Sequence, residues 1–150
     1  MIVIADSSCL IGLSKIGRLD VLRQLFGNVL IPPAVFDEVV IKGRGRPGAS
    51  EVRQAEWILT TPVNNRLAVE MSHLYLGIGE SEAIALAAEH HADFLLRDDW
   101  KARQVALALQ LPVIGTVAIL QKAYEKGIIN DIRAEIDALR QAGFRYDLTI

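Results

Sequence analysis

Apolar residues occur along this chain in four short runs and one weaker, mixed segment, and longer stretches with helical periodicity separate most of them. Uninterrupted apolar runs of this length are typical of strands that are buried on both faces of a sheet. Strands that alternate with helices predict a parallel sheet covered by helices on both sides. The expected strands cover residues 1–5, 29–31, 58–63, 93–97 and 111–114, of which 58–63 is the weakest and is expected at a sheet edge.

The stretches between these runs predict helices that each bury one apolar face. The expected ranges are 9–14, 18–26, 34–42, 49–57, 80–91, 100–109, 116–126 and 130–142. Residues 64–76 are ambiguous and favour a helix, Gly77-Ile78-Gly79 is interpreted as a break, and Phe144 to Ile150 alternates like a strand. No linker or repeat is evident, so we expect a single domain over residues 1–150.

Composition limits the class of protein. The chain has 150 residues, 51% of them hydrophobic, which is enough for a folded core. Its formal net charge of -2 gives no general attraction to nucleic acid or to anionic membranes, so a polyanionic substrate needs a local basic patch or metal ions. Cys9 is the single cysteine and is expected in the core. No signal peptide or membrane-spanning stretch is evident, and we expect a cytoplasmic protein with no membrane partner.

Carboxylates follow two of the predicted strands. Asp6 comes after the run at 1–5, and Asp98 and Asp99 end the run at 93–97. Ligands of open parallel sheets bind outside the carboxyl ends of the strands. Each aspartate could instead cap the helix that follows it. Because the two strand ends match, we favour a functional role for Asp6 and Asp98.

Two glutamates on predicted helices could join these aspartates. Glu80 shares an apolar helix face with Ile84 and Ala87 and should point at the sheet, whereas Glu82 points roughly the opposite way. Glu80 could also simply favour the N-terminus of its helix. Glu38 taken alone is typical of a solvated helix residue.

Four carboxylates in one cleft would repel each other, so either their pKa values rise or cations neutralise them. Oxygen ligands select hard cations such as Mg²⁺ or Mn²⁺. The lone cysteine and the three histidines form no zinc pattern. Hard divalent ions can activate water and stabilise the charge on a phosphodiester during hydrolysis.

The order of these motifs resembles that of PIN domains, with the greatest similarity to compact prokaryotic proteins related to VapC toxins. That group carries Gly-Glu-x-Glu-Ala and Asp-Asp-x-x-Ala-Arg, and the second is matched here by Asp98-Asp99-Trp100-Lys101-Ala102-Arg103. The other matching segments are Asp6-Ser7-Ser8, Pro33-Ala34-Val35-Phe36-Asp37-Glu38, Gly79-Glu80-Ser81-Glu82-Ala83, Val113-Ile114-Gly115-Thr116 and Gly143-Phe144. The resemblance therefore covers nearly the whole chain.

The resemblance implies a three-layer α/β/α sandwich with a central, mostly parallel sheet. It also implies endoribonuclease activity that depends on Mg²⁺ or Mn²⁺, often as the toxin of a toxin–antitoxin pair and frequently as a homodimer. Carried over by position, the catalytic, metal-binding acids would be Asp6, Glu38, Glu80 and Asp98. The supporting residues would be Ser8, Glu82, Asp99 and Thr116.

Basic side chains near these acids could contact an RNA substrate. The candidates are Lys42, Arg44 and Arg46 in a glycine-rich loop, together with Arg97, Lys101 and Arg103. For the loop we favour a plain, solvated segment over a phosphate contact. The second set could equally well only balance the charge of the acids. Trp100 could stack on a nucleotide.

Two other functions are consistent with the sequence. One is a non-catalytic module of the same fold that binds RNA or protein. The other is a phosphatase or phospho-acceptor in which Asp6 is the nucleophile. One common phosphatase pattern has a second aspartate two residues after the first, where this chain has Ser8.

Overall fold

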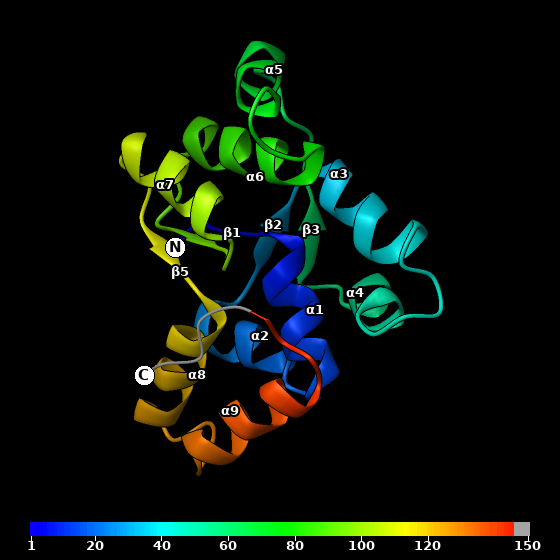
Figure 1. Cartoon of the computed structure of the whole chain (residues 1–150), viewed down its shortest axis with the longest axis vertical. Helices are drawn as coiled ribbons and strands as arrows, with labels where there is room; N and C mark the ends of the chain where they lie inside the picture. Colours follow the sequence, from blue (N-terminus) through cyan, green and yellow to red (C-terminus); the bar gives the residue numbers. More distant parts are fainter. Residues whose placement is uncertain (146–150) are drawn as a thin grey trace.

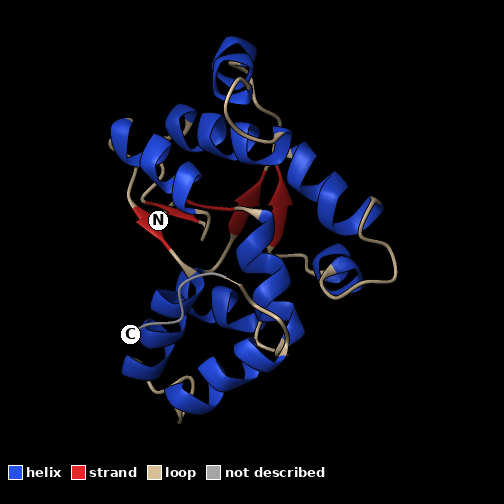
Figure 2. Ribbon diagram, viewed as in Figure 1, coloured by secondary structure: helices blue, strands red, loops and turns tan. Residues whose placement is uncertain are grey.

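A parallel sheet between two layers of helices forms the centre of the computed structural model, which describes residues 1–145 (Figures 1 and 2). The strands lie in the order β3-β2-β1-β4-β5, and all neighbouring pairs are parallel. This confirms the expected α/β/α architecture, and the weak segment at 58–63 supplies one of the two edge strands. The strands are β1 (Val3–Ala5), β2 (Val29–Ile31), β3 (Ile58–Thr60), β4 (Phe94–Leu96) and β5 (Val113–Ile114).

Helices connect the strands close to the ranges expected from the sequence. They are α1 (Ser7–Lys15), α2 (Asp20–Phe26), α3 (Pro33–Phe36), η1 (Asp37–Ile41), α4 (Ala49–Gln54), α5 (Arg66–His73), α6 (Ile78–Glu89), α7 (Trp100–Ala108), α8 (Thr116–Glu125) and α9 (Ile132–Gln141). The helix α4 is shorter than expected because the chain turns at residues 55–57 to enter β3.

Two sequence expectations are changed by the structure. Gly79 lies in the first turn of α6, so Gly77-Ile78-Gly79 starts this helix instead of breaking the chain. At the other end of the chain, residues 144 and 145 form no strand, and the rest of the strand-like tail lies outside the described residues.

The pleat of the sheet divides the core into two parts. Val3 and Ala5 face one side, where they pack with α1, α2, α8 and α9, and Ile4 faces the other, where it packs with α5, α6 and α7. Figure 1 shows these two sets of helices on opposite sides of the strands. Such alternation is what a strand buried on both faces requires.

Small residues bury α6 on nearly all sides. Residues 81–87 of this helix are all buried, and they include Ala83, Ala85 and Ala87. Side chains of this size let a helix lie close to the sheet and to neighbouring helices. The helix therefore has a fixed orientation, which in turn fixes where its first-turn carboxylate, Glu80, points.

The helix expected at 34–42 is interrupted by a π-turn. Residues 33–36 form α3, and Asp37–Ile41 form the π-helix η1, where the Lys42 N–H donates to the carbonyl of Asp37 at 2.8 Å. Single π-turns of this kind often occur at functional sites. Here the turn carries Glu38.

None of the helices formed by residues 1–145 has the length and apolar character needed to cross a membrane.

Candidate functional site

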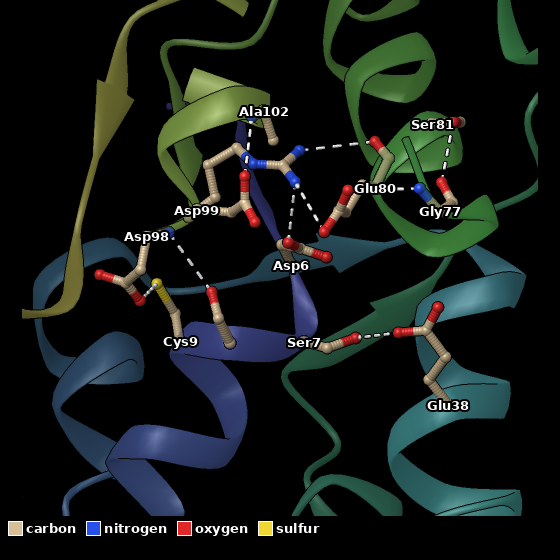
Figure 3. A network of polar contacts seen from close by, with 12 residues as sticks. Asp6, Ser7, Cys9, Glu38, Gly77, Glu80, Ser81, Asp98, Asp99 and Ala102 are labelled. Carbon is tan, nitrogen blue, oxygen red and sulfur yellow. Dashed lines mark hydrogen bonds and ion pairs between the residues drawn. The ribbon is translucent and has the colours of Figure 1, made fainter. Parts of the chain in front are cut away.

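The expected site lies at the carboxyl ends of β1 and β4, beside the first turns of α1 and α6 (Figure 3). The two strands are neighbours with Ala5 paired to Leu96, and the Asp6 N–H donates to the Leu96 carbonyl at 3.0 Å. This pairing brings the chain directly after β1 next to the chain directly after β4. We call Asp6, Glu38 and Glu80 the acidic cluster.

Asp6 is the buried member of the acidic cluster, with 4% of its surface exposed. It stands at the N-cap position of α1, but its side chain makes no capping hydrogen bond. Within residues 1–145, its Oδ1 is buried and has no hydrogen-bond partner. Burial raises the pKa of Asp6 from 3.8 to about 6; the charge of Arg97 and the nearby Ser7 N–H oppose this rise, and the charges of Glu80 and Glu38 add to it.

Arg97 is fully buried between two of these acids. Its Nη2 lies 3.1 Å from Asp6 Oδ2 and 3.9 Å from Glu80 Oε1, and its Nη1 donates to the Glu80 carbonyl at 3.4 Å. The sequence left two roles open for this side chain, RNA contact and charge balance. The structure disfavours RNA contact, because a guanidinium with no exposed surface cannot reach a strand on the outside. It balances the charge of the acids instead.

Glu38 reaches the acidic cluster from η1. Its Oε2 accepts a hydrogen bond from Ser7 Oγ at 2.7 Å, so the first residue of α1 holds this carboxylate. Its carboxylate also lies against Gly79, where an added Cβ would overlap it. The two contacts give Ser7 and Gly79 positioning roles that neither had in the sequence analysis.

The Glu80 carboxylate makes both of the contacts that the sequence left open, one towards the sheet and one at the start of its own helix. One carboxylate oxygen faces Arg97, as the apolar stripe of α6 predicts. The other accepts from the Gly77 N–H at 3.3 Å, a local contact at the start of the helix. The side chain is 30% exposed and is therefore open to solvent on one side.

Asp98 points away from the acidic cluster, which corrects the expectation of four converging acids. Its two oxygens accept from the Thr116 N–H and from Thr116 Oγ1, both at 2.7 Å, and Cys9 Sγ lies 3.4 Å from Oδ2. A Cβ at Gly115 would lie 2.9 Å from Asp98 Oδ1, so this approach needs glycine. The carboxylate of Asp98 thus anchors the start of α8, and Figure 3 shows it beside Cys9 and away from Asp6 and Glu80.

The remaining supporting residues hold helices in place. Ser8 Oγ accepts from the Asp98 N–H at 3.3 Å, and the Asp99 side chain caps α7 by accepting from the Ala102 N–H at 2.9 Å. Glu82 is buried and accepts from the Ala34 N–H at 2.9 Å, with Arg66 at 3.0 Å. Glu82 therefore caps α3 from another helix, and α3 leads into the turn that carries Glu38.

Several basic candidates lie around cavities near the acids. Lys42 and Arg46, together with Lys15, line a cavity of about 400 Å³ that also includes Glu38. No local pattern in the sequence marks Lys15, which joins this group only through the packing of α1 beside the loop.

The other basic candidates are more dispersed. Arg44 lines a separate cavity of about 870 Å³ between η1 and α4. Arg103 and Asp98 border a third cavity, of about 390 Å³, and Lys101 and Trp100 are exposed at the start of α7.

The donor chemistry of the acidic cluster fits a hard divalent cation, but its present spacing does not. All the donors are carboxylate oxygens, and Asp6 Oδ1 is buried without a partner in the described chain. However, no three Asp, Glu, His or Cys side chains among residues 1–145 are close enough together to hold a metal ion. A metal ion therefore requires the partly exposed glutamates to turn towards Asp6.

The comparisons with known proteins give one match. The model of a family described as PIN domain matches residues 2–150, which is nearly the whole chain. No curated protein and no solved structure matches. Families of this kind are typically metal-dependent nucleases that use divalent ions. Because the match extends over almost every residue and the fold agrees with it, the chain belongs to the PIN domain family.

Proposed function

We propose that this protein is a divalent-metal-dependent endoribonuclease that hydrolyses RNA phosphodiester bonds. The observation that carries the proposal is the buried, unpartnered Oδ1 of Asp6, within electrostatic reach of Glu38 and Glu80. Family membership supports the same chemistry.

Asp6, Glu38 and Glu80 would hold the Mg²⁺ or Mn²⁺ ion. When bound, such an ion supplies a Lewis acid and an activated water for attack on phosphorus. Before a metal binds, Ser7 holds Glu38 and Arg97 pairs with Asp6. The two glutamates would turn from these positions towards Asp6 when the ion binds. Asp98 contributes by fixing α8, since Thr116 already occupies both of its oxygens.

A single strand of RNA would approach the acids along the cavity that contains Glu38. Lys15, Lys42 and Arg46 line this cavity and would contact phosphates on one side of the scissile bond. Lys101 and Arg103 begin a second basic region near α7, and the exposed ring of Trp100 would stack on a base there.

The proposal is tested by incubating the purified chain with single-stranded RNA in Mn²⁺ and, separately, in EDTA. We expect cleavage only with Mn²⁺, and a loss of more than about 100-fold in Asp6→Asn, because the variant lacks a carboxylate that would hold the metal. Asp137→Asn, which alters an exposed aspartate on α9, is the matched control and should cleave like the unaltered chain. Cleavage that persists in EDTA or in Asp6→Asn contradicts the proposal.

A second function is favoured by one observation. Because Arg97 stands between Asp6 and Glu80, the acids do not form a ready metal site, as would be expected of a non-catalytic PIN module that binds RNA or protein. RNA binding without cleavage in the same assay would support this alternative. The phosphatase alternative is disfavoured because Asp6 is almost completely buried, and a nucleophile must be reached by its substrate.

Partners beyond RNA are proposals from the family resemblance. Homodimer formation has some structural support, because α5 and the residues after it expose a row of apolar side chains: Leu67, Met71, Leu74 and Tyr75. Light scattering on the purified chain would give its oligomeric state. Co-purification with a protein encoded beside it would test the antitoxin proposal.

A further inference from the structure

We propose that Arg97 is a built-in counter-ion of the acidic cluster, and that the cluster consequently takes a single divalent cation and binds it more weakly than its carboxylates alone would. This inference rests on the proposed function only in that it concerns the same metal. In this inference, the positive charge of Arg97 does what a second metal ion would otherwise do, which is to neutralise part of the charge of the carboxylates.

The position of Arg97 follows from the pairing of the two strands. Ala5 is paired with Leu96, so Asp6 and Arg97 are the next residues on neighbouring parallel strands and their side chains emerge on the same face of the sheet. That face is covered by α6, which brings Glu80 to the same guanidinium. The ion pair is therefore fixed by backbone register.

Burial prevents Arg97 from leaving the acidic cluster. The residue has no exposed surface, and Nη1 donates to the Glu80 carbonyl at 3.4 Å. A guanidinium keeps its proton at any pH at which the protein is folded. Its charge is therefore a permanent component of the site, unlike that of a surface arginine that can swing into solvent.

Charge balance then limits what the cluster can bind. The three carboxylates and the one guanidinium together leave a net charge of minus two, which a single divalent cation neutralises. A second ion would add positive charge beside a buried guanidinium, and repulsion at such short range is strong away from bulk water. Asp98 is left out of this count because its carboxylate is turned to the opposite face of the sheet and is not among the charges that act on Asp6.

The test measures metal binding directly, without RNA. Full-length unaltered chain, Arg97→Gln and Arg97→Lys are titrated with Mn²⁺ by calorimetry, and their melting temperatures are compared in Mn²⁺ and in EDTA. Arg18→Gln is the control, since Arg18 is likewise paired with a carboxylate, that of Glu135, but is partly exposed and lies outside the cluster.

We expect one Mn²⁺ per chain in the unaltered protein. Arg97→Gln should bind Mn²⁺ roughly tenfold more tightly or better, because a repelling charge is removed. It should melt lower in EDTA and gain more from Mn²⁺, since Asp6 and Glu80 then lack their counter-ion. Arg97→Lys should keep the affinity of the unaltered chain, and Arg18→Gln should melt lower by the same amount with and without Mn²⁺.

Two results do not depend on whether Arg97→Gln folds. The unaltered chain must bind one ion, and binding of two ions or of none overturns the inference. Glu38→Gln must weaken Mn²⁺ binding more than Glu80→Gln does, because Arg97 already offsets the charge of Glu80. Equal effects of these two variants, or an Arg97→Gln variant that binds Mn²⁺ no more tightly, would also overturn it.

The outcomes separate this inference from the proposed nuclease function. If RNA cleavage depends on Mn²⁺ but Arg97→Gln has an unchanged affinity for Mn²⁺, the nuclease proposal is supported and the counter-ion role of Arg97 is refuted. If the metal binds as expected but no RNA is cleaved, the nuclease proposal is refuted and the counter-ion role of Arg97 is supported.

Discussion

The ends of β1 and β4 look alike in the sequence, since each apolar run leads into an aspartate, but the two aspartates have opposite surroundings. Asp6 keeps a buried oxygen without a partner in the described chain, whereas both oxygens of Asp98 are occupied by Thr116. The difference arises from one residue. Arg97, and not Asp98, is in register with Asp6, so Asp98 turns to the other face of the sheet.

This comparison separates two uses of a carboxylate that follows a strand. The carboxylate of Asp98 is used for structure, because its hydrogen bonds tie the strand end to α8. The carboxylate of Asp6 lacks such bonds and remains available to a ligand. The sequence motif marks both residues as metal ligands and therefore does not distinguish these two uses. Substituting each residue in turn does distinguish them.

The largest expected effect is on stability at Asp98. Asp98→Ala leaves the N–H of the fully buried Thr116 without its acceptor and leaves its hydroxyl only the weak acceptor Cys9 Sγ. The free energy of unfolding should fall by about 2 to 4 kcal/mol. Urea unfolding at pH 7.5 in EDTA measures this change.

The same measurement on Asp6→Asn completes the comparison. That variant should unfold at the same urea concentration as the unaltered chain or higher, because burial already disfavours the ionised form of Asp6. A loss at Asp6→Asn as large as that at Asp98→Ala would show that the two carboxylates have the same structural use.

The next effect is on pH dependence. The pKa of Asp6 is raised to about 6 in the folded chain, so protonation favours the fold, and the stability it contributes is lost as pH rises through 6. In EDTA, the unaltered chain should gain about 1 to 1.5 kcal/mol between pH 8 and pH 5 from this residue. Urea unfolding across this range should show a smaller gain in Asp6→Asn, and parallel pH profiles would contradict the assignment.

The smallest effect on stability is expected at Gly79. The Cβ of Gly79→Ala overlaps the Glu38 carboxylate, which can turn towards solvent, so the free energy of unfolding should change by less than about 1 kcal/mol. The displaced carboxylate should nevertheless weaken Mn²⁺ binding about tenfold, as calorimetry would show. Gly115→Ala is the counterpart at Asp98 and should affect stability more than metal binding; the reverse pattern would contradict the distinction between the two sites.

The strands β1, β2, β4 and β5 could be predicted from the sequence because each is a short and largely buried apolar run. The edge strand β3 exposes Leu59 and Thr60, and its sequence pattern is correspondingly weak. The direction of Glu80 could also be predicted, since it shares a helical stripe with Ile84 and Ala87, and α6 packs on the sheet with that stripe inward. In both cases the local pattern and the packing give the same answer.

The environment of Asp98 could not be predicted, because its direction depends on a pairing register that the sequence does not specify. For the same reason the sequence could not decide between the two roles left open for Arg97, since burial of an arginine depends on what lies across from it. Glu82 caps α3 from another helix, and no local pattern in the sequence marks a cap supplied from elsewhere in the chain. The single domain over residues 1–150 stays a prediction.

The π-turn at Asp37–Ile41 affects how relatives of this chain should be compared. A π-turn holds one more residue than an α-helical turn over nearly the same rise. A relative that lacks this turn would present its acid from a position one residue earlier or later, although the side chain stood at the same point in space. Alignments across this segment should therefore allow a one-residue gap. An alignment that counts a fixed number of residues from Pro33 would place the acid one position off, and a relative that has the acid would be scored as lacking it.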